Sequence, residues 1–215
     1  MNTLSDTRRE YDYTQLSKKQ LDSNPFAQMK KWLDQAQQAN LKDATVMTLA
    51  TTDNNALPDA RIVMLKQLDE KGFCWFTHYA SKKGQQLAHN PQACLLFYWR
   101  EFDRQVAIRG RVEKLSTQAA EAYFHSRPLN SQFSGAASAQ SQPIESREAL
   151  ENKLQQLKKA NPDAVEKPEN WGGYRLIPAT FEFWQGRENR LHDRFRYTHD
   201  NDNDSEQWTI TRLQP

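Results

Sequence analysis

Glycine is scarce in this chain of 215 residues, which contains only seven. None of them forms GxGxxG or GxxxxGKS/T, so the sequence has neither a dinucleotide-binding turn nor a P-loop. A bound phosphate would therefore need arginine, lysine and hydroxyl side chains as charge-assisted donors. The motifs GxSxG and HExxH are also missing, and the five histidines lack the spacing of metal ligands, so we expect no metal site.

Cysteine, net charge and long apolar runs are equally sparse. Cys74 and Cys94 lie in apolar runs and are expected to be buried free thiols. The longest apolar run, residues 93–99, is far shorter than the ~20 residues that span a bilayer, and the polar N-terminus has no secretion signal. The net charge is only +2, which gives little attraction for nucleic acid. We therefore expect a cytoplasmic protein without a membrane or nucleic-acid partner.

Aromatic residues, in contrast, are plentiful, with ten Phe, seven Tyr and six Trp to fill a core. Asn24 and Pro25 predict the start of a helix whose apolar face continues to Ala36. Alternating β-branched and apolar residues predict strands at residues 45–52, 59–68, 73–77, 92–99, 104–115, 174–185, 191–197 and 207–213. Further helices are expected at residues 81–90, 117–127 and 149–159, and a polar loop at residues 129–143.

The short connections between these strands favour antiparallel pairing. We therefore predict a mainly β fold, one closed antiparallel barrel with peripheral helices. Residues 1–23 carry almost no periodic apolar pattern and are predicted to be a mobile, peripheral arm. Residues 24–215 would then form a single domain.

Two pairs of cations could bind an anion, although each has a plainer explanation. Arg61 and Lys66 bracket a β-type run, but in an extended strand they would lie about 16 Å apart on opposite faces. Strand ends that reach solvent are therefore the favoured interpretation of that pair. Lys82 and Lys83 follow Ser81 at a helix start, where cations oppose the helix dipole unless an anion binds. A solvated charge pair is equally compatible with that position.

A third cluster combines Tyr123 and Arg127, one helical turn apart, with Ser131 beyond the bend at Pro128. These residues offer two hydroxyls and a guanidinium to an anion. An arginine at a helix C-terminus is also favourable without any ligand, and for this cluster alone that is the favoured interpretation.

The C-terminal region carries the strongest local signal. Strand alternation would place Arg190, His192 and Arg194 on one face, where their charges repel unless an anionic or electron-rich ligand lies across them. A solvated outer face could give the same alternation. Trp184 and the turn at Gly186 favour a pocket.

Motifs along nearly the whole chain resemble the pyridoxamine 5′-phosphate oxidase family: RREY (8–11), RIVMLK (61–66), YFHSRP (123–128), FWQG (183–186) and the highly specific RLHDRF (190–195). The resemblance implies an FMN-dependent oxidase that makes pyridoxal 5′-phosphate from pyridoxine 5′-phosphate and pyridoxamine 5′-phosphate. Molecular oxygen would be the electron acceptor and H2O2 the second product. The implied architecture is a split β-barrel homodimer with FMN at the subunit interface.

The same resemblance implies roles for individual positions. FMN would be bound by Arg61, Ile62, Val63, Met64, Leu65, Lys66, Phe76, Thr77, Lys82, Lys83, Gln105, Gln140, Ser141, Trp184 and Arg194. Substrate would be bound by Arg8, Tyr11, Lys66, Tyr123, Arg127, Ser131, Arg190 and His192. Within that set, Lys66, Tyr123, Arg127 and Ser131 would hold the phosphate, and Arg190 and His192 would act on the pyridine ring as the catalytic residues. Arg8 and Tyr11 would close over the site, which would make the arm a lid.

The chain departs from the family pattern at a few positions. Phe76 stands where the family often has Tyr, and Lys82 replaces a usual Arg, which keeps the charge but loses the bidentate fork. Gln140 and Ser141 lie in a loose match. A flavin- or pyridoxal-phosphate-binding module without turnover is the alternative function. The two are separated by whether the protein is yellow and whether pyridoxine 5′-phosphate bleaches it without air.

Overall fold

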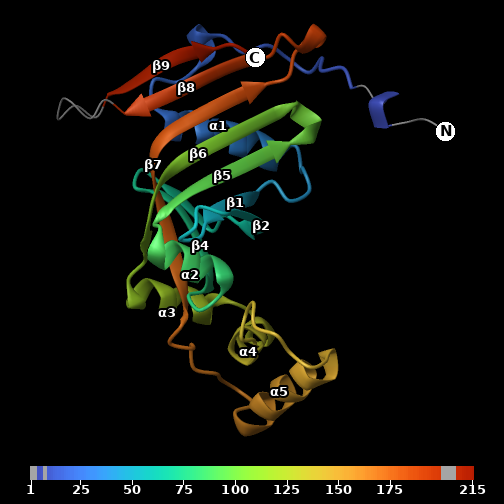
Figure 1. The fold of residues 1–215 in the computed structure, drawn as a ribbon, viewed down its shortest axis with the longest axis vertical. Helices are drawn as coiled ribbons and strands as arrows, with labels where there is room; N and C mark the ends of the chain where they lie inside the picture. The colour runs from blue at the N-terminus through green and yellow to red at the C-terminus, as the bar shows by residue number, and fades with distance from the viewer. Residues whose placement is uncertain (1–3, 7–8, 200–206) are drawn as a thin grey trace.

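The chain folds around one nine-stranded antiparallel sheet with helices at its margins (Figure 1). This computed structural model describes residues 4–6, 9–199 and 207–215. The strands are β1 (Val46–Thr52), β2 (Pro58–Met64), β3 (Gln67–Asp69), β4 (Gly72–His78), β5 (Gln92–Trp99), β6 (Arg104–Lys114), β7 (Trp171–Gln185), β8 (Asp193–His199) and β9 (Trp208–Leu213). The α-helices are α1 (Pro25–Gln38), α2 (Lys82–His89), α3 (Thr117–Ser126), α4 (Leu129–Ala137) and α5 (Arg147–Ala160).

Strand β7 divides the sheet, because it changes partner half-way along its length. On one side, residues 174–185 pair with β6. On the other side, residues 171–176 pair with β4 and residues 180–185 pair with β8. The sheet order is β2-β1-β5-β6-β7-β4-β3, with β8 and β9 added beside the second half of β7. This arrangement confirms the predicted antiparallel split barrel.

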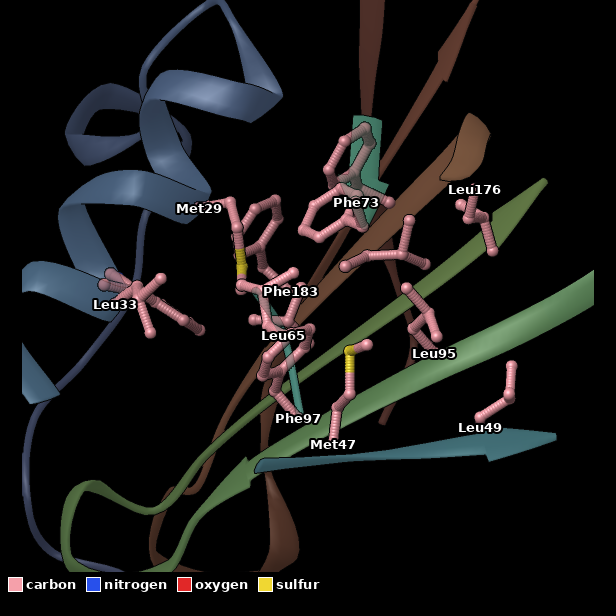
Figure 2. Packing of buried hydrophobic residues seen from close by; sticks show 14 of the residues in the cluster. Met29, Leu33, Met47, Leu49, Leu65, Phe73, Leu95, Phe97, Leu176 and Phe183 are labelled. Atoms are coloured by element: carbon pink, nitrogen blue, oxygen red, sulfur yellow. The ribbon is translucent and has the colours of Figure 1, made fainter. Parts of the chain in front are cut away.

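The barrel interior is filled by aromatic and aliphatic side chains. Phe73, Phe97 and Phe183 are fully buried there, together with Met29 from α1 (Figure 2). Helix α1 begins as predicted: the side chain of Asn24 accepts a hydrogen bond from the backbone N–H of Phe26 at 2.8 Å, ahead of the first turn. Within the described residues, no helix is long and apolar enough to cross a membrane.

Two predicted boundaries were wrong. The strand expected at residues 59–68 breaks at Leu65, which is buried, so that β2 and β3 are separate strands. The polar loop expected at residues 129–143 contains α4. Its low-propensity sequence is held helical by tertiary contacts, since Phe133 is buried against Phe124 and Gln132 donates a hydrogen bond to the Arg127 carbonyl at 2.8 Å.

The N-terminal arm, from residue 9 onward, lies against the barrel. The Leu16 side chain is buried, and its backbone N–H donates to the Asp193 carboxylate at 3.0 Å. Tyr13 stacks on Phe102 with ring centroids 4.9 Å apart. Of the two thiols, Cys74 is buried and Cys94 only half-buried, and burial raises the pKa of both.

Candidate active site

Most of the predicted site residues line one open cleft of about 830 Å³ between β2, β4, α3 and α4. The residues that the sequence predicted and that line it are Arg61, Ile62, Val63, Met64, Lys66, Phe76, Thr77, Lys83, Tyr123, Arg127, Ser131, Gln140 and Ser141. The break between β2 and β3 explains how Arg61 and Lys66 reach the same cleft, which a continuous strand would not allow.

Arg127 is the most unusual group in the cleft. One terminal nitrogen, Nη2, donates to the Ser131 carbonyl at 2.6 Å, which pins α4 to the end of α3. The other, Nη1, is buried and has no hydrogen-bond partner in the described chain. Burial lowers the pKa of this guanidinium. An unpaired buried donor on a cation is costly, and an anion in the cleft would satisfy it.

Lys83 forms a second cationic point, at the start of α2. Its side chain is buried, and its ammonium donates to the Thr77 hydroxyl at 3.2 Å and to the Gln140 Oε1 atom at 3.1 Å. Thr77 also donates to Gln140 Oε1, at 2.8 Å. Burial, and then the nearby Arg61 cation, lower the pKa of Lys83. These oxygens are neutral and leave the charge of Lys83 available to an anion.

Asp59 balances part of this charge at the rim. Its carboxylate lies 3.0 Å from Arg61 and 2.9 Å from Lys82. Lys82 is exposed and does not line the cleft. Instead it contacts Asp59, and its hydrogen bond is the first cause of the lowered pKa of that carboxyl. Leu65 is likewise absent from the lining because its side chain faces the core.

Three aromatic rings form a wall of the cleft. Phe76 stacks on Tyr123 with centroids 3.8 Å apart, and both rings are nearly parallel to the indole of Trp171. The Arg127 guanidinium carbon lies 5.0 Å from the Trp171 ring centroid. Flat apolar surface beside cationic donors suits a planar heterocycle with a phosphate.

The remaining predicted residues gather elsewhere, where the arm crosses the end of β7. Tyr11 meets Trp184 edge-on with centroids 5.6 Å apart, and meets His192 likewise at 5.2 Å. The Arg190 guanidinium carbon lies 5.5 Å from the centre of the Tyr11 ring. Burial, and then the Arg190 cation, lower the pKa of His192. Arg8 lies outside the described residues.

The prediction that Arg190, His192 and Arg194 share one strand face was wrong. Residues Glu188–Arg190 form a 3-10 turn, and Asn189 and Arg190 both have left-handed backbone, with φ of 55° and 63°. Strand β8 begins only at Asp193, so strand alternation does not apply to the earlier residues.

Arg194 does lie on β8, where its side chain is held by a carboxylate. Its Nε and Nη2 atoms donate to Glu182 at 3.1 and 2.6 Å, and Nη1 donates to the Gln214 carbonyl at 3.0 Å. Gln105 lies near this group, because it pairs with Trp184 across the β6–β7 ladder.

The two groups lie at opposite ends of one strand. Trp171 in the cleft and Trp184 in the second group are 13 residues apart on β7, which corresponds to about 40 Å along the strand. Within one chain, no vitamer-sized molecule can touch both groups. Figure 1 shows the same separation, with α3 and α4 far from the turn that joins β7 to β8.

The sequence prediction missed several cleft residues. His78, Ser134, Gly135, Ser138 and Trp171 also line it. His78 is buried, one of its ring nitrogens lies 2.8 Å from the Gly135 carbonyl oxygen, and burial lowers its pKa. Only Trp171 carried a usable signal, as a large aromatic residue before a Gly-Gly pair. Ser134, Gly135 and Ser138 depend on the unpredicted helix α4, and His78 is the last residue of β4, one beyond the predicted strand.

The sequence matches two family models. Residues 33–160 match the model described as pyridoxamine 5′-phosphate oxidase. Residues 171–215 match the pyridoxine 5′-phosphate oxidase C-terminal dimerisation region, which supports the expected homodimer. Trp184, Arg190, His192 and Arg194 all lie in the dimerisation region.

Full-length relatives agree with these matches. The chain is 50% identical to a pyridoxine/pyridoxamine 5′-phosphate oxidase of Paraburkholderia phymatum over 100% of both chains. It is 48% identical to the protein of the same description from Trichormus variabilis, over 99% of both.

Solved structures show the same fold. PhzG of Burkholderia lata, in complex with tetrahydrophenazine-1-carboxylic acid, superposes with a TM-score of 0.85 at 31% identity, covering 92% of this chain and 95% of that one. An FMN-binding protein of Nostoc punctiforme related to pyridoxamine 5′-phosphate oxidase shares the fold at 19% identity, with a TM-score of 0.70 over 89% of this chain and 98% of that one. The chain belongs to the pyridoxamine 5′-phosphate oxidase family of oxidoreductases.

Proposed function

We propose that this protein oxidises pyridoxine 5′-phosphate and pyridoxamine 5′-phosphate to pyridoxal 5′-phosphate, with FMN as cofactor, O2 as electron acceptor and H2O2 as second product. The observation that carries the proposal is the buried, unpartnered Nη1 of Arg127 beside a wall of flat aromatic rings. Full-length identity of 50% to a pyridoxine/pyridoxamine 5′-phosphate oxidase supports it.

The substrate phosphate would bind at the α3–α4 end of the cleft. Arg127 supplies the buried donor, and Tyr123, Ser131 and Lys66 line the same cleft with two hydroxyls and an ammonium. Such charge-assisted donors replace the glycine-rich loop that the chain lacks. The bound phosphate would thus fix one end of the substrate and hold its C4′ carbon in one orientation.

The donor set on β2, β4 and α2 fits FMN. Arg61 and Lys83 are partly or wholly buried cations for the FMN phosphate, and the Thr77 hydroxyl and Gln140 amide add polar contacts. Residues 62–64 line the same cleft. When bound, FMN supplies the redox chemistry, since it accepts a hydride from the substrate and is reoxidised by O2.

We further propose that each site is shared between two copies of the chain. Trp184, Arg190, His192, Arg194 and Gln105 lie about 40 Å along β7 from the cleft and cannot reach it within one chain. A two-fold axis would place this group of one copy over the cleft of the other. The second copy's Arg190 and His192 would then orient the pyridine ring, and Trp184, Gln105 and Arg194 would contact FMN.

The N-terminal arm fits a lid in this arrangement. Residues 1–23, with Arg8 and Tyr11, would cover the bound substrate and exclude water, and residues 24–215 would form the barrel domain. Tyr11 already lies against His192 and Trp184.

The direct test is spectroscopic. Purified protein should be yellow, and anaerobic addition of pyridoxine 5′-phosphate should bleach the flavin absorbance. Admission of air should restore the colour with one H2O2 formed per pyridoxal 5′-phosphate. A yellow protein that neither phosphate bleaches would instead be a binding module without turnover.

Subunit complementation tests the shared site. An Arg127→Met chain has a defective cleft, and an Arg190→Met chain has a defective second group. In a mixed dimer, one site joins the defective cleft to the defective second group. The other site joins the intact cleft of the Arg190→Met chain to the intact second group of the Arg127→Met chain. Since about half of randomly assembled dimers are mixed, equal co-expression should restore about a quarter of wild-type activity. If each site lay within one chain, no mixture would exceed the activity of the two single variants.

A further inference from the structure

Arg9 makes a three-point attachment between the arm and the barrel. Its guanidinium forms an ion pair with Asp103, donates to the Tyr98 hydroxyl at 2.7 Å and donates to the Arg100 carbonyl at 2.6 Å. Arg100 and Asp103 belong to the connection between β5 and β6, and Tyr98 lies near the end of β5. The sequence singled out Arg8 and Tyr11 for roles at the site, and Arg9 between them was given none.

The acceptor side of this attachment is rigid. Asp103 is only 4% exposed and has left-handed backbone with φ of 49°, the conformation that closes the turn into β6. Its carbonyl accepts a hydrogen bond from the Gly186 N–H at 2.8 Å, which ties the turn to the end of β7. A buried carboxylate needs a charged or hydrogen-bonding partner, and Arg9 supplies one.

The attachment fixes the position of Tyr11. The Arg9 guanidinium carbon lies 5.1 Å from the centre of the Tyr11 ring, which is edge-on to both Trp184 and His192. Gly186 packs directly beneath Tyr11, since a Cβ added there would lie 2.6 Å from the Tyr11 Cδ1 atom. Tyr11 is therefore held from the arm side by Arg9 and from below by the β7–β8 turn.

We propose that Arg9 is a positioning residue: through its ion pair with Asp103 it holds Tyr11 over His192 and Trp184, and so closes the arm over the substrate. This inference rests on the proposed function. Arg9 acts on the reaction through Tyr11, because its guanidinium donors are directed to acceptors at the end of β5 and in the β5–β6 connection.

Amide hydrogen exchange on the FMN-loaded dimer tests the attachment itself, without any turnover. Arg9→Ala and Asp103→Asn should each speed exchange in residues 9–16 about tenfold, as expected for losing a partly buried charge-assisted contact. Asn also tolerates left-handed backbone, so Asp103→Asn keeps the turn. Arg9→Lys keeps the charge but loses the planar guanidinium with its several donors, so its exchange rate should lie between those of the wild-type protein and Arg9→Ala. The control is Arg147→Ala, which removes an exposed ion pair with Glu151 on α5.

Steady-state kinetics then separates a positioning role from a direct one. The single variants Arg9→Ala and Asp103→Asn should raise KM about tenfold with kcat nearly unchanged, and the double variant should be no worse than either. If Asp103→Asn left both KM and exchange at wild-type values while Arg9→Ala raised KM, Arg9 would contact substrate directly and the proposal would be overturned. If wild-type protein oxidised neither phosphate but the exchange results held, the proposed function would fail and the attachment would stand.

Discussion

Replacing Arg127 with methionine should have opposite consequences for the free protein and for its complex with a phosphate. The change removes the hydrogen bond from Nη2 to the Ser131 carbonyl, a charged contact worth about 1.5–3 kcal/mol. It also removes the buried, unpartnered Nη1, whose desolvation costs about 1–3 kcal/mol. The two effects nearly cancel, so the free energy of unfolding of the ligand-free variant should lie within about 1 kcal/mol of the wild-type value. Urea denaturation of the flavin-free protein measures this difference.

With phosphate present, the balance changes. A ligand that binds only the folded protein stabilises it by RT ln(1 + [L]/Kd), so inorganic phosphate should raise the Tm of the wild-type protein. Loss of one phosphate contact at Arg127, worth about 1.5–3 kcal/mol, should weaken phosphate binding by about tenfold to 150-fold. In the FMN-loaded protein, where the flavin phosphate would occupy Arg61 and Lys83, inorganic phosphate should therefore barely raise the Tm of Arg127→Met.

The loss in kcat/KM should be as large as the loss in phosphate binding. Arg127→Met should lower kcat/KM for pyridoxine 5′-phosphate about tenfold to 150-fold, mostly through KM, with flavin content near wild type. Unphosphorylated pyridoxine should be a very poor substrate of the wild-type protein, and the variant should not make it worse. Equal losses on both vitamers would refute the phosphate assignment. A variant that lost more than about 3 kcal/mol of stability but kept full activity would show a purely structural role.

Three further results are expected. Because the Arg190 cation helps to lower the pKa of His192, Arg190→Met should move the imidazole NMR titration of His192 upward, toward the ordinary value of about 6.5. A titration that stayed in place or moved downward would contradict this. Gly110→Ala should destabilise the protein by about 3 kcal/mol in urea, because its Cβ would lie 1.9 Å from the Ile177 carbonyl oxygen at the bulge between β6 and β7. A Cβ at Gly135 would lie 3.1 Å from the flexible end of the Arg127 side chain and in ordinary contact with Phe124 at 3.6 Å, so Gly135→Ala should raise KM for the phosphorylated substrate with little loss of stability. An equal loss of stability in both glycine variants would contradict the distinction.

The strands and the start of α1 were predictable because their signals are local. Alternation, turn residues and the Asn24–Pro25 cap each depend on a few neighbouring positions. Helix α4 was not predictable, because its glycine- and serine-rich sequence has weak helix propensity and becomes helical only when Phe133 is buried against Phe124. The same dependence hid the cleft residues that α4 contributes.

The positions of the site residues could not be predicted from strand and helix periodicity alone. Period-two alternation failed at Arg190 because two consecutive residues with positive φ turn the chain before β8 begins. The contact between Arg9 and Asp103 joins positions 94 apart, which no local pattern shows. Most residues that the family resemblance groups around FMN and the substrate phosphate line one cleft, although Leu65 and Lys82 do not. The resemblance does not distinguish residues of one chain from residues that only a second copy can bring into place.

The cations of the cleft and those of the second group differ in how their charges are paired. In the cleft, Arg127 keeps a donor unpaired and Lys83 contacts only neutral oxygens. At the far group, Glu182 accepts hydrogen bonds from both Arg194 and Arg196. Glu182 therefore offsets part of the charge of Arg194 before any ligand binds, whereas no carboxylate is paired with Arg127 or hydrogen-bonded to Lys83 in the described residues. This difference supports our proposal that the phosphate groups bind in the cleft and that the uncharged parts of the flavin and the pyridine ring would lie against the second copy.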